Sequence, residues 1–263
     1  LGKCAIGLIM PDSGESIFLD ENIYTKKGND LKNTKKNLQI IFQDPYASLN
    51  PRMTVGEIIS EPIITHNKGM KKEEVKSKVL ELMQDVGIRK EYYNRYPHQF
   101  SGGQRQRIGI ARAIALNPKL IVCDEPVSAL DVSIQSQVLN LLKDLQEKKK
   151  ASYLFISHDL SVVNFIADRV CVMFLGKICE IGNTDDIFEN PLHPYTKLLL
   201  DAIPSIENAG RQKEMLKGEI PSPIDVPSGC RFHTRCPHCM DICKTDEPVL
   251  NEKNGRSVAC HRV

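Results

Sequence analysis

The sequence predicts an α/β core with an inserted helical subdomain, followed by a tail rich in proline and cysteine. Short apolar runs such as Leu120–Cys123 are typical of strands buried on both faces of a parallel sheet. Residues 46–99 carry apolar residues at helical spacing instead. Eight of the fifteen prolines and five of the nine cysteines lie from Pro191 onward. Long regular elements are therefore not expected in most of the tail.

Length, charge and hydropathy exclude several classes of protein. A chain of 263 residues can bury a full α/β core and one smaller subdomain. Its net charge of +2 provides no electrostatic footprint for nucleic acid, so no nucleic-acid partner is expected. No apolar run approaches the ~18 residues of a membrane span, and no signal peptide opens the chain. We expect a soluble protein that acts at membranes only through partners.

The first 43 residues predict one helix and two strands. Leu1–Ile9 has a helical pattern that ends at the turn Pro11–Gly14. Ile17–Leu19 and Leu38–Phe42 are apolar runs typical of strands. Gln43 follows the second strand directly, where the strand gives way to a loop.

Helical patterns continue from residue 46 to residue 115. One apolar face repeats at i, i+4, i+7, i+8 and i+11 and predicts the core side of a helical subdomain. Ser101 is a good N-cap for the next helix, which opens at Gly102, Gly103 and Gln104. Unpaired N–H groups and the helix dipole make such a helix start a ready anion site. The apolar face consists of Val75, Val79, Leu82, Met83 and Val86.

Two adjacent carboxylates, Asp124 and Glu125, close the strand Leu120–Cys123. They lie at its carboxyl end, where α/β sheets place their ligands. Adjacent carboxylates there suit two tasks: one holds Mg²⁺, and the other orients a water for attack on a phosphate. Asp131 predicts the N-cap of a further helix. The apolar face of that helix is Ile134, Val138, Leu141, Leu142 and Leu145.

The sheet is expected to continue through Ser152–Ser157, which His158 follows. A histidine that closes a core strand is more often packed than functional when it is considered alone. Val170–Phe174 and Lys177–Ile181 are predicted to complete the edge of the sheet. The α/β core is expected to end at Asp186–Asn190.

After a predicted helix at Pro194–Ala202, the tail contains a cluster of cysteines. Their clustering favours a metal site over disulfides in a reducing compartment, although scattered structural cysteines remain an alternative. Cys239 is a spare that can replace one ligand. The four candidate ligands are Cys230, Cys236, Cys243 and Cys260, followed by His261. The cysteines in apolar runs, expected to be buried, are Cys4, Cys123, Cys171 and Cys179.

The order of these motifs resembles the nucleotide-binding subunit of ABC transporters. The matching features are Ser101–Gln104, the strand that ends in Asp124-Glu125-Pro126, the Ser128–Asp131 turn, and the strand that ends in Ser157-His158-Asp159. The run Asp44–Pro51 and the cysteine-rich tail are similar to the ATPase subunits of bacterial oligopeptide and dipeptide importers. The resemblance implies a P-loop NTPase-like ABC ATPase core that binds and hydrolyses ATP with Mg²⁺.

The resemblance also implies domain boundaries and a role for each site residue. Gln43 and Asp124 would hold Mg²⁺, Glu125 would position the attacking water, and His158 would contact the γ-phosphate. The implied domains are 1–43 and 117–190 for the core, 44–116 for the helical subdomain with the signature motif, and 191–263 for the extension. Ser101, Gly102, Gly103, Gln104 and Asp131 would complete the nucleotide site.

In such a transporter the partners are a second ABC ATPase subunit, either a paralogue or another copy, two membrane permease subunits and an extracellular or periplasmic solute-binding protein. The chain would be peripheral on the cytoplasmic face of the membrane, with a candidate docking patch at Pro45–Arg52. The resemblance implies that Cys230, Cys236, Cys243 and Cys260 ligate a [4Fe–4S] cluster. The same four thiolates can hold zinc, and spacing alone does not separate the two.

The phosphate loop is the feature that the sequence does not supply. Such a loop needs a glycine five residues before its Gly-Lys pair and a Ser or Thr after it. Gly2-Lys3 fails this test, because nothing precedes Leu1 and Cys4 occupies the Ser/Thr place. By the resemblance Leu1 lies just after the loop, so we expect a truncated polypeptide that binds ATP poorly.

Three alternative functions differ from peptide import. Importers of nickel or another small solute share this kind of tail. A non-catalytic fragment or an iron–sulfur or other metal-binding module would need no ATP. ABC ATPases of DNA repair or translation usually carry coiled-coil inserts or two cassettes, and neither is present in this sequence.

Overall fold

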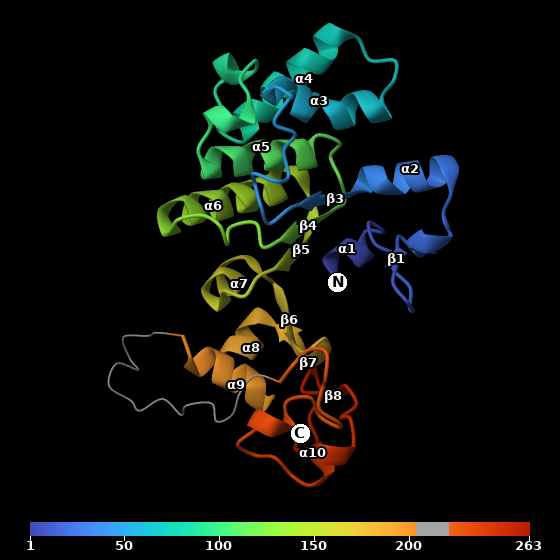
Figure 1. The fold of residues 1–263 in the computed structure, drawn as a ribbon, viewed down its shortest axis with the longest axis vertical. Helices are drawn as coiled ribbons and strands as arrows, with labels where there is room; N and C mark the ends of the chain where they lie inside the picture. The colour runs from blue at the N-terminus through green and yellow to red at the C-terminus, as the bar shows by residue number, and fades with distance from the viewer. Residues whose placement is uncertain (204–220) are drawn as a thin grey trace. The chain divides into compact units, whose positions relative to one another are not determined.

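A computed structural model describes residues 1–203 and 221–263 of the chain (Figure 1). The chain divides into two compact units, Leu1–His158 and Asp159–Val263. Both contain helices and strands, so the α/β class predicted from the sequence is confirmed. The predicted domain boundaries remain predictions, and part of the predicted extension, 204–220, lies outside the described residues.

A parallel sheet forms the centre of the first unit. Its strands are β3 (Leu38–Ile41), β4 (Leu120–Asp124) and β5 (Ser152–Ile156), in the order β3-β4-β5. In register, Ile41 pairs with Cys123, and Asp124 pairs with Ile156. The carboxyl ends of all three strands therefore lie at one edge of the sheet. Gln43, Glu125 and His158 follow these ends, as the sequence predicted.

The beginning of the chain is less helical than predicted. The helix α1 spans only Gly2–Ala5, because the chain turns at Ile6 and Gly7 takes a left-handed φ of 68°. The predicted strand near residue 17 is present as β1 (Ile17–Phe18). The remaining elements before the sheet are β2 (Glu21–Asn22), which pairs with β1, η1 (Ile23–Thr25) and α2 (Gly28–Asn37).

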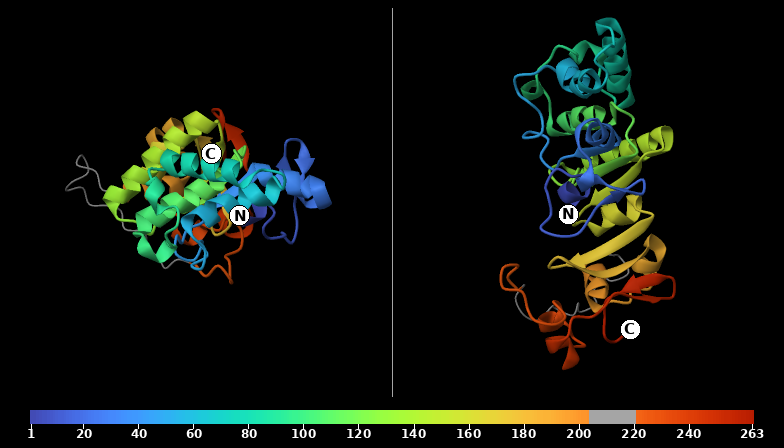
Figure 2. Two further views of the ribbon diagram at one scale, coloured as in Figure 1. Left: turned by 90° about the horizontal axis from the view of Figure 1, so that it is seen from above. Right: turned by 90° about the vertical axis from the view of Figure 1, so that its right-hand side faces the viewer.

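A group of helices joins β3 to β4. The views agree that α3 (Val55–His66), α4 (Lys72–Asp85) and α5 (Gly102–Ile114) lie together (Figures 1 and 2). The predicted apolar face of α4 is buried, with Val79 and Met83 both fully enclosed. Two short 3-10 helices, η2 (Lys90–Tyr92) and η3 (Pro97–Gln99), lie between α4 and α5. The predicted helical subdomain is thus present.

The helix α6 (Val132–Lys149) begins at Asp131, whose side chain caps it as predicted. Its buried residues include Val138, Leu142 and Leu145, so the predicted apolar face points into the core.

The second unit contains an antiparallel sheet of four strands. The prediction that Val170–Phe174 and Lys177–Ile181 extend the parallel sheet is wrong. Leu175 and Gly176 have φ values of 44° and 77°, so they form a tight hairpin turn between the two strands. The free edge of the hairpin pairs with tail residues. The sheet order is β6-β7-β9-β8, with β6 (Arg169–Phe174), β7 (Lys177–Asn183), β8 (Asn251–Lys253) and β9 (Arg256–Val258).

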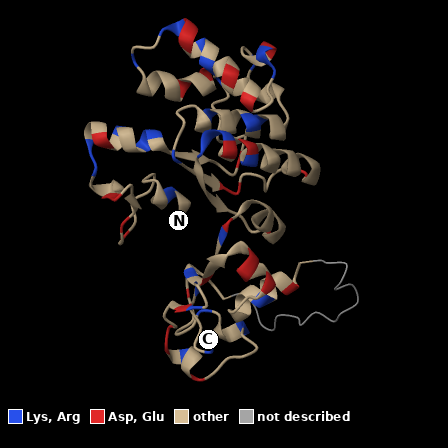
Figure 3. Cartoon of the chain, turned by 180° about the vertical axis from the view of Figure 1, so that it is seen from behind, with Lys and Arg blue, Asp and Glu red and all other residues tan. Residues whose placement is uncertain are grey.

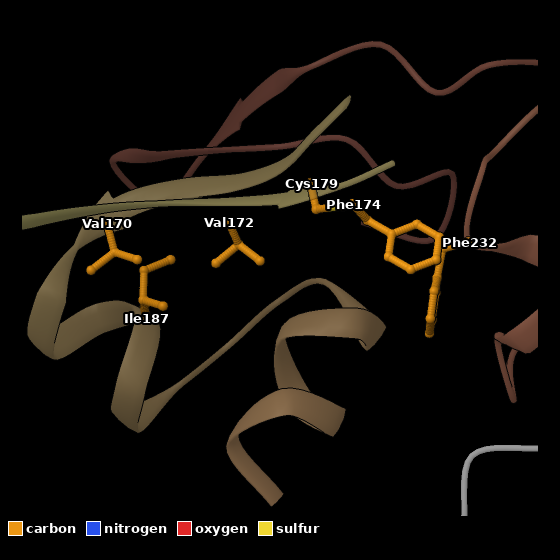
Figure 4. Close-up of a cluster of buried hydrophobic side chains, with 6 residues drawn as sticks. All are labelled: Val170, Val172, Phe174, Cys179, Ile187 and Phe232. Atoms are coloured by element: carbon orange, nitrogen blue, oxygen red, sulfur yellow. The ribbon is translucent and has the colours of Figure 1, made fainter. Parts of the chain in front are cut away.

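One face of β6 packs on the core of this unit. Val170, Val172 and Phe174 alternate with exposed residues and point toward Ile187 and Phe232 (Figure 4). Cys171 is on the other face and is exposed, which corrects the expectation that it is buried. Its apolar run belongs to a strand covered on one face only. Cys123 and Cys179 are buried as expected, whereas Cys4 is only half-buried.

Short helices complete the second unit, as its proline content predicted. The helix α9 (Pro194–Asp201) confirms the predicted helix after His193. The others are α7 (Leu160–Ile166), α8 (Thr184–Glu189), η5 (His233–Arg235) and α10 (Ile242–Thr245).

Acidic and basic residues are interspersed along the helices, in agreement with the small net charge (Figure 3). Within 1–203 and 221–263, no helix has both the length and the apolar character needed to cross a membrane.

Candidate active site

Three polar side chains meet at the carboxyl edge of the parallel sheet. Gln43 Nε2 donates a hydrogen bond to Glu125 Oε2 at 2.7 Å. His158 Nδ1 lies 3.1 Å from Glu125 Oε1. Each residue follows a different strand, so the sheet itself brings them together. The side chain of Glu125 is 25% exposed and that of His158 is 73% exposed, which leaves the group open to a ligand.

The backbone of Glu125 is strained. Its φ of 46° is left-handed, which is uncommon for a residue with a side chain. Its N–H donates to the carbonyl of Ile156 at 3.1 Å, and the hydroxyl of Ser128 donates to its carbonyl at 3.1 Å. Strain of this kind persists only where surrounding contacts enforce it, and it is frequent at active sites. No sequence pattern indicated it.

Asp124 ends β4 and is half-buried, next to Glu125. Its carboxylate and the amide oxygen of Gln43 are hard oxygen ligands of the kind that Mg²⁺ prefers. The residues present therefore fit the predicted Mg²⁺ site in their chemistry.

The segment Ser101–Gln104, called the signature segment below, forms the start of α5. The hydroxyl of Ser101 accepts a hydrogen bond from Gln104 N at 3.4 Å, and Gln104 Oε1 accepts one from Ser101 N at 3.1 Å. This reciprocal capping box confirms Ser101 as the N-cap. The N–H groups of Gly102 and Gly103 belong to the first turn, which has no partner inside the helix for them. The helix start can therefore bind an anion.

Asp131 lies beside the signature segment. A Cβ added to Gly103 would be 2.4 Å from Cγ2 of Ile134, so glycine is needed for α5 and α6 to approach there. Asp131 Oδ1 accepts from Ile134 N at 3.0 Å and from the hydroxyl of Ser133 at 2.8 Å. The bond from Ile134, then the one from Ser133, lowers the pKa of Asp131, so this carboxylate stays ionised.

The loop after Gln43 is an ordered turn. Asp44 Oδ1 accepts hydrogen bonds from the backbone N–H of Tyr46 at 2.7 Å and of Ala47 at 3.2 Å. Leu49 is buried, whereas the side chain of Tyr46 is exposed. The predicted docking patch Pro45–Arg52 therefore combines an exposed aromatic side chain with a well-anchored backbone.

Two arginines of α5 contact this loop, and neither was among the predicted site residues. The guanidinium of Arg105 stacks on the Tyr46 ring, and Arg112 donates a hydrogen bond to the carbonyl of Ser48. A signal was available, because Arg105, Ile108 and Arg112 recur at i, i+3 and i+7 on one face of the helix.

The four predicted cysteine ligands of the second unit line one small pocket. Cys230 N donates to the carbonyl of Cys243 at 2.9 Å, which joins two of them through the backbone. Burial raises the pKa of the Cys230 and Cys236 thiols, and the neighbouring cysteines raise it further. Cys239 is exposed. Over the described part of the chain, no three His, Cys, Asp or Glu side chains stand at metal-binding geometry.

Comparisons with known proteins decide the family. Residues 1–128 match the family model for the ABC transporter, and residues 179–243 match that for the oligopeptide/dipeptide transporter, C-terminal region. The oligopeptide transport ATP-binding protein AppF of Bacillus subtilis (strain 168) is 52% identical over 265 residues, which cover 99% of this chain and 80% of AppF.

The chain belongs to the ABC transporter ATP-binding proteins of the oligopeptide/dipeptide family. The oligopeptide transport ATP-binding protein OppF of Escherichia coli (strain K12) is 50% identical, over 99% of this chain and 79% of OppF. The dipeptide transport ATP-binding protein DppF of Haemophilus influenzae (strain ATCC 51907 / DSM 11121 / KW20 / Rd) is 48% identical, over 100% of this chain and 82% of DppF.

Solved structures agree with this family. The dimeric post-hydrolysis state of the ATP-binding cassette MJ0796, bound to ADP and Pi, superposes with a TM-score of 0.62 at 28% identity, over 70% of this chain and 78% of that one. The cbiO1 protein of Clostridium perfringens, part of the cbiONQ ABC transporter complex, gives a TM-score of 0.63 at 26% identity, over 72% of this chain and 73% of that one. The predicted ABC ATPase fold is confirmed. As a member of this family, the chain is an ATP-hydrolysing subunit of a transporter. The ligands of this family are ATP and Mg²⁺.

Proposed function

We propose that the full-length protein hydrolyses ATP to energise the import of oligopeptides or dipeptides. The contact group Gln43–Glu125–His158 supports this proposal most strongly, because a carboxylate held between an amide and an imidazole is suited to orienting water. The oligopeptide/dipeptide region at 179–243 and the names of the relatives support the substrate class.

In this mechanism Glu125 accepts a hydrogen bond from the attacking water and aligns it with the γ-phosphate. Gln43 and His158 hold its two carboxylate oxygens and so orient the carboxylate. The second ring nitrogen of His158 is then available to a phosphate oxygen. Asp124 and the amide oxygen of Gln43 would hold Mg²⁺. Bound Mg²⁺ neutralises the charge that develops on the transferred phosphoryl group.

The signature segment would act on the nucleotide of a second ATPase subunit, either a paralogue or another copy. The first turn behind Ser101 directs N–H groups and the positive end of the helix dipole outward, and both favour a γ-phosphate. ATP would therefore join two subunits, and hydrolysis would release them. Asp131, beside this segment, would complete the same interface.

The remaining partners are two permease subunits and an extracellular or periplasmic solute-binding protein, with the chain peripheral at the cytoplasmic face of the membrane. The patch Pro45–Arg52 is the proposed permease contact, since it combines the exposed Tyr46 ring with a backbone that Asp44 fixes.

An uptake assay tests the substrate class. Cells without this gene would be supplied with radiolabelled dipeptide, tetrapeptide or Ni²⁺, and then complemented with the full-length gene. Loss of peptide uptake that the gene restores is the expected result. Unchanged peptide uptake would reject the proposal. Loss of Ni²⁺ uptake alone would establish the alternative, an importer of nickel or another small solute.

We also propose that Cys230, Cys236, Cys243 and Cys260 ligate a [4Fe–4S] cluster, with zinc as the alternative. Their convergence on one pocket supports a shared ligand. Thiolates bind such metals, and a metal cation offsets the burial that raises their pKa. Anaerobically purified protein should show an iron–sulfur charge-transfer absorption band and should contain iron and sulfide. Stoichiometric zinc without iron would contradict the cluster, and the exposed Cys171→Ser variant is the control.

A further inference from the structure

Two arginines of α5 face the loop that follows Gln43. Arg105 and Arg112 are seven residues apart, which is about two helical turns, so both lie on one side of the helix. Arg105 is only 8% exposed, and Arg112 is half-buried. A buried guanidinium needs partners for its charge and its N–H groups. Both arginines find such partners in or next to the loop.

Arg105 stacks on the exposed tyrosine of the loop. Its guanidinium carbon lies 3.7 Å from the centre of the Tyr46 ring, well within the range of a cation–π contact. Two hydrogen bonds hold the guanidinium in place, because Nε donates to the carbonyl of Pro97 at 2.7 Å and Nη2 to that of His98 at 3.4 Å. Arg105 therefore provides a rigid platform on which one face of the ring rests.

Arg112 holds the same loop two residues later. Its Nη1 donates to the carbonyl of Ser48 at 2.7 Å, and its guanidinium carbon lies 6.0 Å from the centre of the Phe42 ring. Phe42 directly precedes Gln43. Contacts from α5 thus reach the chain on both sides of Gln43, whose amide is bonded to Glu125.

We propose that Tyr46 and Arg105 are positioning residues for ATP hydrolysis, which fasten the Gln43 loop to the helix that begins at Ser101. When a nucleotide draws the start of α5 toward it, the stacked ring makes the loop move with the helix. Gln43, which already donates to Glu125, then keeps its place on that carboxylate while the signature segment closes. This inference rests on the proposed function, because it assigns the stack to that reaction.

Steady-state ATP hydrolysis by the assembled full-length transporter tests the inference. Tyr46→Ala removes the ring, so kcat should fall at least fivefold while KM for ATP stays within twofold. Tyr46→Phe keeps the ring on Arg105 and should remain within twofold of wild type. Tyr96→Ala is the matched control, because this exposed tyrosine stacks on His98 and should leave both parameters unchanged.

Several results would overturn the inference. Wild-type kinetics for Tyr46→Ala would do so, as would a Tyr46→Phe variant that is as slow as Tyr46→Ala. A Tyr46→Ala protein that no longer co-purifies with the permease subunits, and in which residues 44–50 exchange as in wild type, would also overturn it, since the tyrosine would then act in docking alone.

Amide hydrogen exchange without nucleotide separates this inference from the proposed function. Residues 44–50 should exchange faster in Tyr46→Ala than in wild type, and Tyr46→Phe should match wild type. If the wild-type transporter hydrolyses no ATP, the proposed function fails, and faster exchange in Tyr46→Ala still supports the stack as the loop's fastening. Unchanged exchange in Tyr46→Ala would overturn the inference, whatever the activity.

Discussion

The two units of the molecule position their important side chains in different ways. In the first, Gln43, Glu125 and His158 follow directly on the ends of parallel strands, so backbone pairing brings them together. In the second, short antiparallel strands and loops are joined by buried charged side chains. The first arrangement follows from the order of elements, whereas the second depends on individual polar contacts.

Glu180 is the centre of the polar contacts in the second unit. Its side chain is completely buried and accepts hydrogen bonds from the backbone N–H groups of Leu192 and His193, both at 2.9 Å. Arg256 Nη1 lies 3.7 Å from Glu180 Oε1 and donates to the carbonyl of Asn190 at 2.6 Å. These contacts join β7 and β9 to the segment before α9.

The largest expected effect is on this buried pair. Glu180→Ala would leave Arg256 buried without its counter-charge. It would also leave two backbone N–H groups without a hydrogen-bond acceptor. Breaking one partner of a buried pair typically destabilises a protein by about 3–5 kcal/mol. Urea unfolding, followed by a probe in the second unit, measures this. The control is Glu252→Ala, because Glu252 is exposed on β8. A loss below about 1 kcal/mol would show that backbone pairing suffices in the second unit as well.

In the first unit, removing charge should affect chemistry and leave stability nearly unchanged. Glu125→Gln keeps the size of the side chain but weakens its ability to accept a proton from water. We expect kcat for ATP hydrolysis by the transporter to fall about 10²–10³-fold, the usual effect of losing one group that acts on the transition state. ATP binding, measured by equilibrium dialysis, should be retained. Glu147→Gln, an exposed change on α6, is the matched control. Full hydrolysis by Glu125→Gln would remove Glu125 from the mechanism.

The sequence was informative where a local pattern determines the outcome. Periodicity identified the buried face of α4, and single residues identified the caps Ser101 and Asp131. The sequence was not informative about which distant segment pairs with the edge of a sheet. The pairing of β7 with β9 depends on residues 76 positions apart, such as Ile181 and Ser257, and no local pattern records that choice.

The candidate sites show the same contrast. Strand ends predicted which side chains meet at Glu125, since parallel strands end at one edge. The left-handed backbone of Glu125 arises from the turn that Ser128 closes, and its sequence carries no glycine to reveal it. Cys171 was predicted to be buried because an apolar run does not show whether one or both faces of a strand are covered.

In the second unit, a pH effect on stability should come from His193. His193 is 2% exposed, and burial lowers its pKa to about 4. The unfolded state, with a pKa near 6.5, then binds more protons, so stability is complete above about pH 6.5 and falls as the pH approaches 4. The loss at pH 4 is about 3 kcal/mol from the difference in pKa.

Urea unfolding at pH 7 and pH 4 would measure this loss in wild type and in His193→Asn. Asparagine can still cap α9, where His193 Nδ1 now accepts from Tyr195 N at 3.0 Å, but it does not titrate. All other titratable groups are present in both proteins, so the difference isolates His193. An identical pH dependence in the two proteins would contradict the assignment.

The smallest expected effect separates stability from function within the first unit. Ser101 and Thr54 both close capping boxes, at α5 and α3. Replacing either by alanine removes a side-chain acceptor for a backbone N–H and should lower stability by about 1 kcal/mol. Only Ser101 lies at the helix start proposed to meet a nucleotide, so Ser101→Ala alone should also slow ATP hydrolysis by the transporter. Because Thr54→Ala carries the same structural loss, equal hydrolysis by the two variants would mean that the start of α5 serves the fold and not the phosphate.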